Sequence, residues 1–139
     1  MRGISSMKID NKPPSAAELA SMYQEAGWIE NPDLQKMKKS VNSDSQWFVA
    51  RDNDSNLLGI GRFMTDYVRY AFIVDVIIKE KYRNKGVGTA IMTGIITQCR
   101  ELGLESVNLW PSEGKVPFYE GLGFYALPSS QLHMKLKNV

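Results

Sequence analysis

Residues 70–103 read YAFIVDVIIKEKYRNKGVGTAIMTGIITQCRELG and join three kinds of segment in one run. The first, residues 70–78, is almost continuously apolar, which is typical of a central strand covered on both faces. Only Asp75 interrupts it. The last, residues 87–103, repeats apolar residues at helical spacing and ends at a glycine. The run therefore predicts a buried strand, a glycine-rich loop and a long helix.

The loop between that strand and that helix, residues 83–88, has the chemistry of an anion site. Backbone N–H groups at a helix start face outward, and the helix dipole favours negative charge there. Gly86 and Gly88 leave the main chain open to a phosphate group, while Arg83 and Lys85 add positive charge. A solvated basic turn is the alternative interpretation, because short glycine motifs also occur by chance.

Two common phosphate-binding loops do not fit this segment. A dinucleotide-binding fingerprint requires a third glycine where Ile91 stands, and a P-loop requires Gly-Lys-Ser/Thr after a four-residue gap, which is absent. The loop belongs to neither class.

Patterns on either side place further elements around this run. Ser15 and Glu18 form a capping-box pattern for a helix that extends to about residue 26. Apolar spacing and strand-like alternation predict the remaining elements: a short helix at 33–41, a hairpin at 47–63, a strand at 106–110, a short helix at 116–121 and a last strand at 131–137.

Composition restricts the classes of protein to consider. The chain has 139 residues, 43% of them hydrophobic, so we expect one domain over residues 1–139, with residues 1–6 as either a loose terminus or an added remnant outside the fold. A net charge of +2 is too small for a general nucleic-acid binder. Cys99 and His133 are the sole cysteine and histidine, which argues against a disulfide framework and a structural metal. No segment approaches the length of a membrane span, and the start of the sequence, residues 1–6, lacks an apolar core of signal-peptide length, so cytoplasm is the expected location.

Two motifs in this sequence resemble those of the GNAT superfamily of N-acetyltransferases. Residues 82–90, YRNKGVGTA, are similar to its Arg/Gln-x-x-Gly-x-Gly/Ala acetyl-CoA signature, and residues 115–124, KVPFYEGLGF, resemble its Phe-Tyr-Glu-x-Leu-Gly-Phe segment. The order of predicted elements agrees over nearly the whole chain. The resemblance implies an α/β (α+β) fold: a mixed, mostly antiparallel sheet flanked by helices and split in a V at its central strands.

The resemblance also implies roles for the cofactor-binding residues. The backbone of Val76, Ile77 and Ile78 would hydrogen-bond the pantetheine arm of acetyl-CoA. A backbone N–H near Val76 or Ile77 would polarise the acetyl carbonyl. The glycine-rich loop and its neighbour would bind the pyrophosphate, through Arg83, Asn84, Lys85, Gly86, Val87, Gly88 and Thr89.

Two residues are candidates for the catalytic proton transfers. Tyr119 matches the family tyrosine that protonates the departing thiolate, a role suited to a phenol with a pKa of about 10; packing as an ordinary helix aromatic is the alternative. Asp75 is the candidate base for the amine, with a structural carboxylate as the equal alternative.

Cys99 lies within the long helix, which favours direct transfer over an acetyl-cysteine. Four further residues are weaker candidates for the acceptor pocket: Trp28, Trp47, Asp66 and Tyr67.

We therefore predict an acetyl-CoA-dependent N-acetyltransferase that acts on a primary amine of a small molecule or peptide, with no metal, nucleic-acid or membrane partner. A non-catalytic acetyl-CoA-binding regulatory module is the alternative, against which the intact Tyr119 argues. Ser112 stands where many members of the superfamily carry asparagine, which puts one side-chain contact to the cofactor in question. The resemblance also allows a homodimer, while the identity of the amine stays open.

Overall fold

A single sheet organises residues 6–139, the part of the chain that the computed structural model describes. Its five strands follow the order β1-β2-β3-β4-β5. Neighbouring strands are antiparallel, except that β4 and β5 run parallel. The expected mixed, mostly antiparallel sheet is thus confirmed, with β1 at Lys8–Asp10, β2 at Gln46–Arg51, β3 at Leu57–Thr65, β4 at Tyr70–Ile78 and β5 at Ser106–Leu109.

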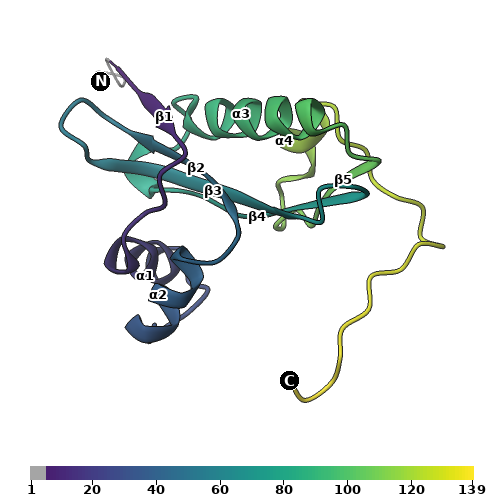
Figure 1. The fold of residues 1–139 in the computed structure, drawn as a ribbon, viewed down its shortest axis with the longest axis horizontal. Coiled ribbons are helices and arrows are strands. Elements are labelled where there is room, and N and C mark those ends of the chain that lie inside the picture. Colours follow the sequence, from purple (N-terminus) through teal and green to yellow (C-terminus); the bar gives the residue numbers. More distant parts are fainter. Residues whose placement is uncertain (1–5) are drawn as a thin grey trace.

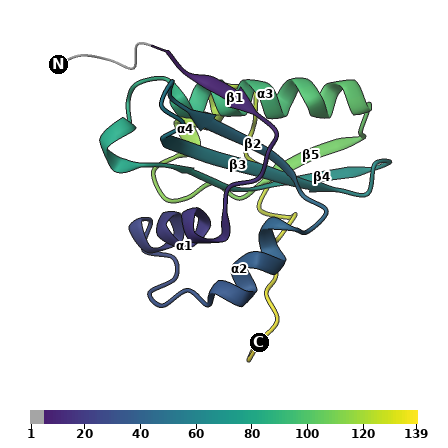
Figure 2. The same cartoon turned by 60° about the vertical axis from the view of Figure 1, so that its left-hand side comes forward.

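Helices cover both faces of this sheet. Helices α1 (Ala16–Glu25) and α2 (Leu34–Val41) lie on one face and α3 (Val87–Leu102) lies on the other (Figure 1, Figure 2). The short helix α4 (Val116–Glu120) follows β5. Each face has its own apolar core: Leu19, Met22, Trp47, Ile60 and Ile77 on the α1/α2 side, and Phe48, Phe63, Ile73, Ile91 and Ile95 on the α3 side.

Helix α1 begins as its sequence predicts and is tied to the sheet by the same residue that caps it. The Ser15 hydroxyl accepts a hydrogen bond from the Glu18 N–H at 3.1 Å, and the Glu18 carboxylate accepts one from the Ser15 N–H at 2.9 Å. The two carboxylate oxygens of Glu18 also accept hydrogen bonds from the Arg51 guanidinium on β2, at 2.8 Å each. This pairing lowers the pKa of Glu18 from about 4.5 to about 2.

Replacing Glu18 by glutamine should lower stability at neutral pH by at most about 1 kcal/mol, because the ion pair with Arg51 is partly exposed. Glutamine can keep the capping hydrogen bond, so the change removes mainly the charge. A depressed pKa contributes stability above pH 4.5 that is lost as the pH falls toward 2, so the difference from the wild type should shrink across that range. Thermal unfolding at several pH values tests this. Glu101→Gln is the control, and an equal pH trend there would contradict the prediction.

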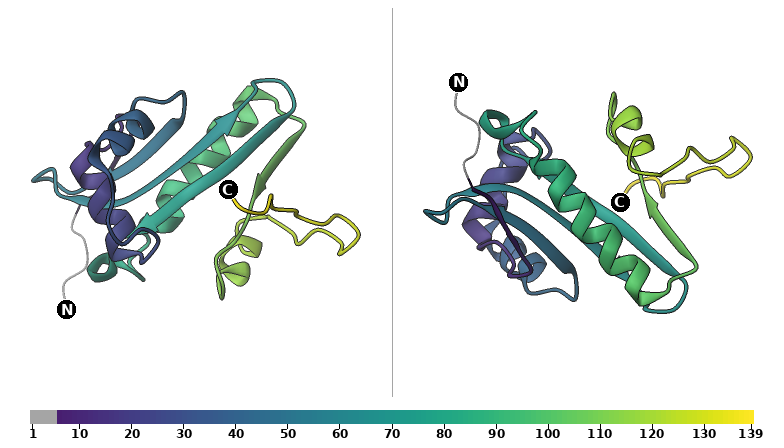
Figure 3. Two further views of the ribbon diagram at one scale, coloured as in Figure 1. Left: turned by 90° about the horizontal axis from the view of Figure 1, so that it is seen from below. Right: turned by 90° about the horizontal axis from the view of Figure 1, so that it is seen from above.

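Strand β4 carries a bulge in its middle and separates from β5 beyond it. Ile60 on β3 pairs with Ile77 and Arg62 pairs with Val74, so that Gly61 lies opposite two residues of β4. Pairing with β5 covers only residues 70–73, and the two strands diverge from there (Figure 3). The V-shaped split expected at the central strands is therefore present.

The last predicted strand, residues 131–137, is wrong. The chain after α4 runs without regular structure and leads away from the sheet (Figure 1). Leu132, Met134 and Leu136 are 77%, 87% and 82% exposed. Alternation of apolar and polar residues sets which face each side chain would take, but a strand forms only where its backbone pairs with a neighbour.

Within residues 6–139, no helix is both long and apolar enough to span a bilayer.

Candidate active site

The loop between β4 and α3 leaves the first turn of α3 open. Asn84 and Gly86 both have left-handed backbones, with φ of 61° and 84°. Gly86 is the N-cap residue, and no side chain caps the helix there. A methyl group at Gly86 would meet nothing within 4 Å. The first turn therefore has no capping side chain, and the space beside Gly86 is open, an arrangement that suits an anion at the backbone N–H groups of a helix start.

The other predicted loop residues differ in what they present. Arg83 is exposed and donates a hydrogen bond through Nε to the Ile78 carbonyl at 3.3 Å, which ties the loop to the end of β4. Val87 is 1% exposed, so its side chain belongs to the core and only its backbone is available. Asn84 and Thr89 are exposed, and Lys85 is partly buried. The loop thus offers backbone amides with cationic side chains beside them.

The two motif segments meet in space. A methyl group at Gly88 would lie 3.5 Å from Phe118 Cζ and 3.6 Å from Ile78 Cγ1. The start of α3 therefore faces both the end of β4 and helix α4. This contact brings together segments that are about thirty residues apart in the chain.

Tyr119 lies next to that contact on α4. Its ring makes edge contacts with Phe118 and Phe124, with ring centroids 5.0 and 6.0 Å apart. Burial raises the pKa of Tyr119, which keeps the phenol protonated at neutral pH. Tyr119 also lines a cavity of about 470 Å³ between the second half of α3, β5 and α4. Among residues 6–139 nothing hydrogen-bonds its hydroxyl, so the proton can be donated to a bound molecule.

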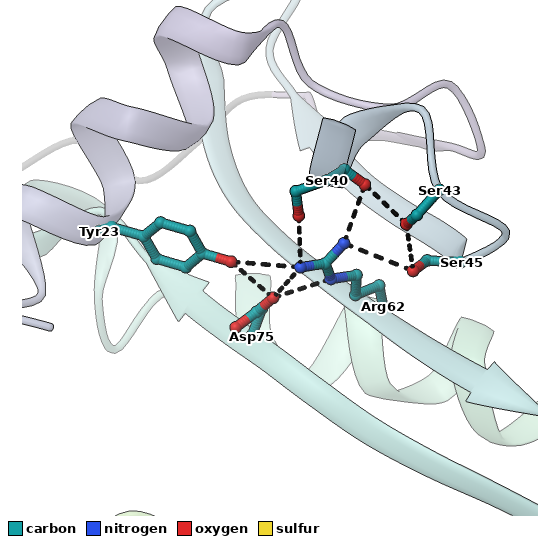
Figure 4. A network of polar contacts seen from close by, with 6 residues as sticks. All are labelled: Tyr23, Ser40, Ser43, Ser45, Arg62 and Asp75. Atoms are coloured by element: carbon teal, nitrogen blue, oxygen red, sulfur yellow. Dashed lines mark hydrogen bonds and ion pairs between the residues drawn. The ribbon is translucent and has the colours of Figure 1, made fainter. Parts of the chain in front are cut away.

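Asp75 lies on the opposite face of the sheet from α3, within a polar network (Figure 4). Its Oδ2 accepts hydrogen bonds from the Tyr23 hydroxyl at 2.8 Å and from Arg62 Nε at 2.8 Å, and forms an ion pair with Arg62 Nη2 at 2.7 Å. Among the described residues, these contacts all reach Oδ2 and leave Oδ1 unbonded. Burial, followed by the Asp75 charge, raises the pKa of Tyr23 to about 12. The partners of the Asp75 carboxylate thus come from helix α1 and strand β3.

Arg62 extends this network to α2 and β2. Its guanidinium donates to the Ser40 carbonyl at 3.2 Å and the Ser40 hydroxyl at 2.8 Å, and lies 4.4 Å from the centroid of the Trp47 ring. Trp47 is 2% exposed and is therefore a core residue beneath Arg62, not part of an open pocket. Asp66 accepts backbone hydrogen bonds from residues 68–70 and so closes the β3–β4 turn.

A row of aromatic rings on the Asp75 face of the sheet did not emerge from the sequence. Tyr70 packs on Phe72 with centroids 6.1 Å apart, Phe72 packs on Trp110 at 5.8 Å, and Trp110 stacks on His133 at 4.5 Å. The two-residue spacing of Tyr70 and Phe72 in β4 is visible in the sequence. That Trp110 lies next to Phe72, however, depends on the register between β4 and β5. Only the fold supplies that register, in which Phe72 lies beside Asn108.

Known proteins are similar to this chain in sequence and in fold. Residues 8–124 match the model of the Acetyltransferase (GNAT) family. The uncharacterized N-acetyltransferase ycf52 of Pyropia yezoensis is 29% identical over 121 residues, covering 85% of this chain and 69% of that protein. The glucosamine 6-phosphate N-acetyltransferase of Trypanosoma brucei brucei is 41% identical over 54 residues, covering 39% and 37%. This chain spans 62–69% of the length of the ycf52 relatives.

A solved structure supports the same fold. A protein of unknown function from Staphylococcus aureus, named a probable acetyltransferase, superposes with a TM-score of 0.83 at 18% identity, over 95% of this chain and 99% of that one. At this identity the likeness concerns the fold alone. The family model, in contrast, covers most of the chain and both motif segments. The chain therefore belongs to the acetyltransferase (GNAT) family.

Proposed function

We propose that this acetyltransferase takes its acetyl group from acetyl-CoA and transfers it directly to a primary amine of a small molecule or peptide. The observation that carries the proposal is the open first turn of α3, which faces both the end of β4 and the helix that bears Tyr119. This arrangement supports the proposal because it would put an anion site and a proton donor on the two sides of one split. We also propose that the protein works without a metal.

The residues around the split fit the parts of acetyl-CoA. The pyrophosphate would accept hydrogen bonds from backbone N–H groups of Gly86, Val87, Gly88 and Thr89, with Arg83, Asn84 and Lys85 beside it. The pantetheine arm would lie along the stretch Val76, Ile77 and Ile78, which β5 does not pair. Acetyl-CoA supplies an activated thioester, so that the protein needs to orient it and move protons.

The chemistry assigns one proton to each candidate side chain. The amine nitrogen attacks the thioester carbonyl carbon; the C–N bond forms and the C–S bond breaks. Tyr119 donates its phenolic proton to the departing sulfur. Asp75 accepts the proton of the amine through Oδ1, directly or by way of water. Cys99 is buried in α3 and burial raises its pKa to about 11, which supports direct transfer over a cysteine intermediate.

The acceptor would bind on the face of the sheet that carries Asp75 and the aromatic row. The partly buried Phe72 and the exposed Trp110 offer flat apolar surface there. A relative in Trypanosoma brucei is named for glucosamine 6-phosphate, so this amino sugar belongs in any panel of acceptors.

Further expectations stay predictions: a cytoplasmic location, no nucleic-acid or membrane partner, and a homodimer. The exposed Leu132, Met134 and Leu136 form the apolar surface that would support a homodimer. The alternative function is a regulatory module that binds acetyl-CoA without turnover.

The proposed function predicts that the purified chain releases CoA from acetyl-CoA only when a suitable amine is present. A thiol-detection assay with a panel of polyamines, arylalkylamines, aminoglycosides, amino acids, amino sugars and peptides tests this. Amine-dependent release identifies the substrate class. Calorimetric binding of acetyl-CoA with no turnover on the whole panel would favour the regulatory alternative, and no binding would contradict the proposal.

A further inference from the structure

We propose that Arg62 and Tyr23 are positioning residues for catalysis: by holding Asp75, they fix the bulge of β4 and thereby the backbone of Val76 and Ile77 at the β4–β5 split. The inference rests on the proposed function, because that function places the acetyl-CoA arm on this backbone. The proposed reaction uses only Asp75 of this buried network, and the inference assigns a role to Arg62 and Tyr23 as well.

The bulge changes which face of the sheet each residue of β4 presents. Ile73 packs in the core on the α3 side, whereas Ile77, four residues on, packs in the core on the α1/α2 side. Strict alternation would place both on one face. The extra residue opposite Gly61 shifts the phase, so Asp75 and Ile77 face α1 and α2 while Val76 faces α3.

The backbone of Asp75 needs support to keep this shape. Its φ is 55°, in the left-handed region, which is uncommon for residues other than glycine and persists where the surroundings hold it. The support comes through the side chain, since Tyr23 and Arg62 together direct three polar contacts of 2.7–2.8 Å to Oδ2. One partner comes from α1 and the other from β3, so the bulge is held from two sides (Figure 4).

Arg62 is itself held firmly enough to act as the support. Its guanidinium bonds both the carbonyl and the hydroxyl of Ser40 on α2 and packs on the buried Trp47 of β2. Only 11% of its side chain is exposed. The network therefore connects both helices on this face to one point of β4, and that point lies two residues beyond the last pair with β5, Ile73 with Leu109. Rigid outer contacts of this kind keep reacting groups in place.

The prediction is that loosening the network weakens binding of the acetyl-pantetheine arm but not binding at the loop. Arg62→Lys keeps a positive charge and loses the planar fork, and Tyr23→Phe keeps the buried ring and loses one hydrogen bond. We expect the Kd for acetyl-CoA to rise roughly tenfold in Arg62→Lys and less in Tyr23→Phe, with a lower kcat in both. The Kd for adenosine 3′,5′-bisphosphate, a CoA fragment without the arm, should stay unchanged.

Arg51→Lys is the matched control. Arg51 also forms a bidentate pair with a carboxylate, that of Glu18, but it lies on β2 and not on one of the two strands, β4 and β5, that form the split. The control variant should lower stability and leave both Kd values as in the wild type. In ligand-free protein, NMR amide signals of Val76 and Ile77 should shift in Arg62→Lys and not in Arg51→Lys.

The outcomes separate the inference from the proposed function. If the wild type binds acetyl-CoA and both network variants bind it equally well, the positioning role is wrong while the proposed function stands. Equal loss of acetyl-CoA and fragment would indicate general damage to the fold and also overturn the positioning role. If the wild type binds neither compound, the proposed function fails and this inference falls with it. Should Arg62→Lys not fold, Tyr23→Phe decides alone.

Discussion

Replacing Tyr119 by phenylalanine should lower kcat for acetyl transfer by about 100-fold or more and leave the KM for acetyl-CoA nearly unchanged. Phenylalanine keeps the edge contacts with Phe118 and Phe124, so the cavity lining is preserved. What is lost is the proton for the departing sulfur. An interaction made only in the transition state affects kcat and not ground-state binding.

The pH profile gives a second readout of the same prediction. An acid catalyst acts in its protonated form, and burial raises the pKa of Tyr119 above its ordinary value of about 10. The wild type should therefore keep its activity into the alkaline range and lose it only as the phenol ionises, whereas the phenylalanine variant should lack that alkaline loss. Tyr125→Phe is the control, since Tyr125 is nearby and 79% exposed. A Tyr119→Phe variant with the wild-type kcat would exclude the acid role.

Replacing Gly86 by valine should raise the Kd for acetyl-CoA by at least about tenfold. A left-handed backbone costs an L-residue about 1–2 kcal/mol, and a β-branched side chain would also stand where the anion is expected to approach. Calorimetry measures the Kd for acetyl-CoA and the Kd for adenosine 3′,5′-bisphosphate. Both Kd values should rise, because both ligands carry phosphate.

Gly103 provides a matched control for this substitution. It follows the other end of α3, has a φ of 67°, and, like Gly86, has nothing within 4 Å of an added methyl group. Gly103→Val should therefore lower the melting temperature by a similar amount and leave the affinity for acetyl-CoA unchanged. If the two variants lost affinity equally, the effect would come from strain in α3 and the loop would not be the anion site.

Local signals predicted the helices and most of the strands. Helix α1 begins at the capping box of Ser15 and Glu18, α2 begins after Asp33, and α3 ends at Gly103, because caps act within a few residues of the chain. The segment 131–137 shows the limit of such signals. Its alternation is as regular as that of a strand, yet pairing is a non-local event, and within residues 6–139 the backbone of this segment pairs with no strand of the sheet.

The candidate site likewise combines features that local sequence predicts with features that only the fold brings together. The sequence by itself determined the family, the glycine-rich loop at a helix start, and Asp75 as a polar interruption in an apolar strand, because each depends on residues close together in the chain. Only the tertiary structure decided that Tyr23, which is 52 residues away, and Arg62 hold Asp75, that its backbone is left-handed, and that Trp110 stands beside Phe72. Those facts depend on the register of β3, β4 and β5 and on how α1 packs across them, and no pattern within one segment encodes the partner that another segment will bring.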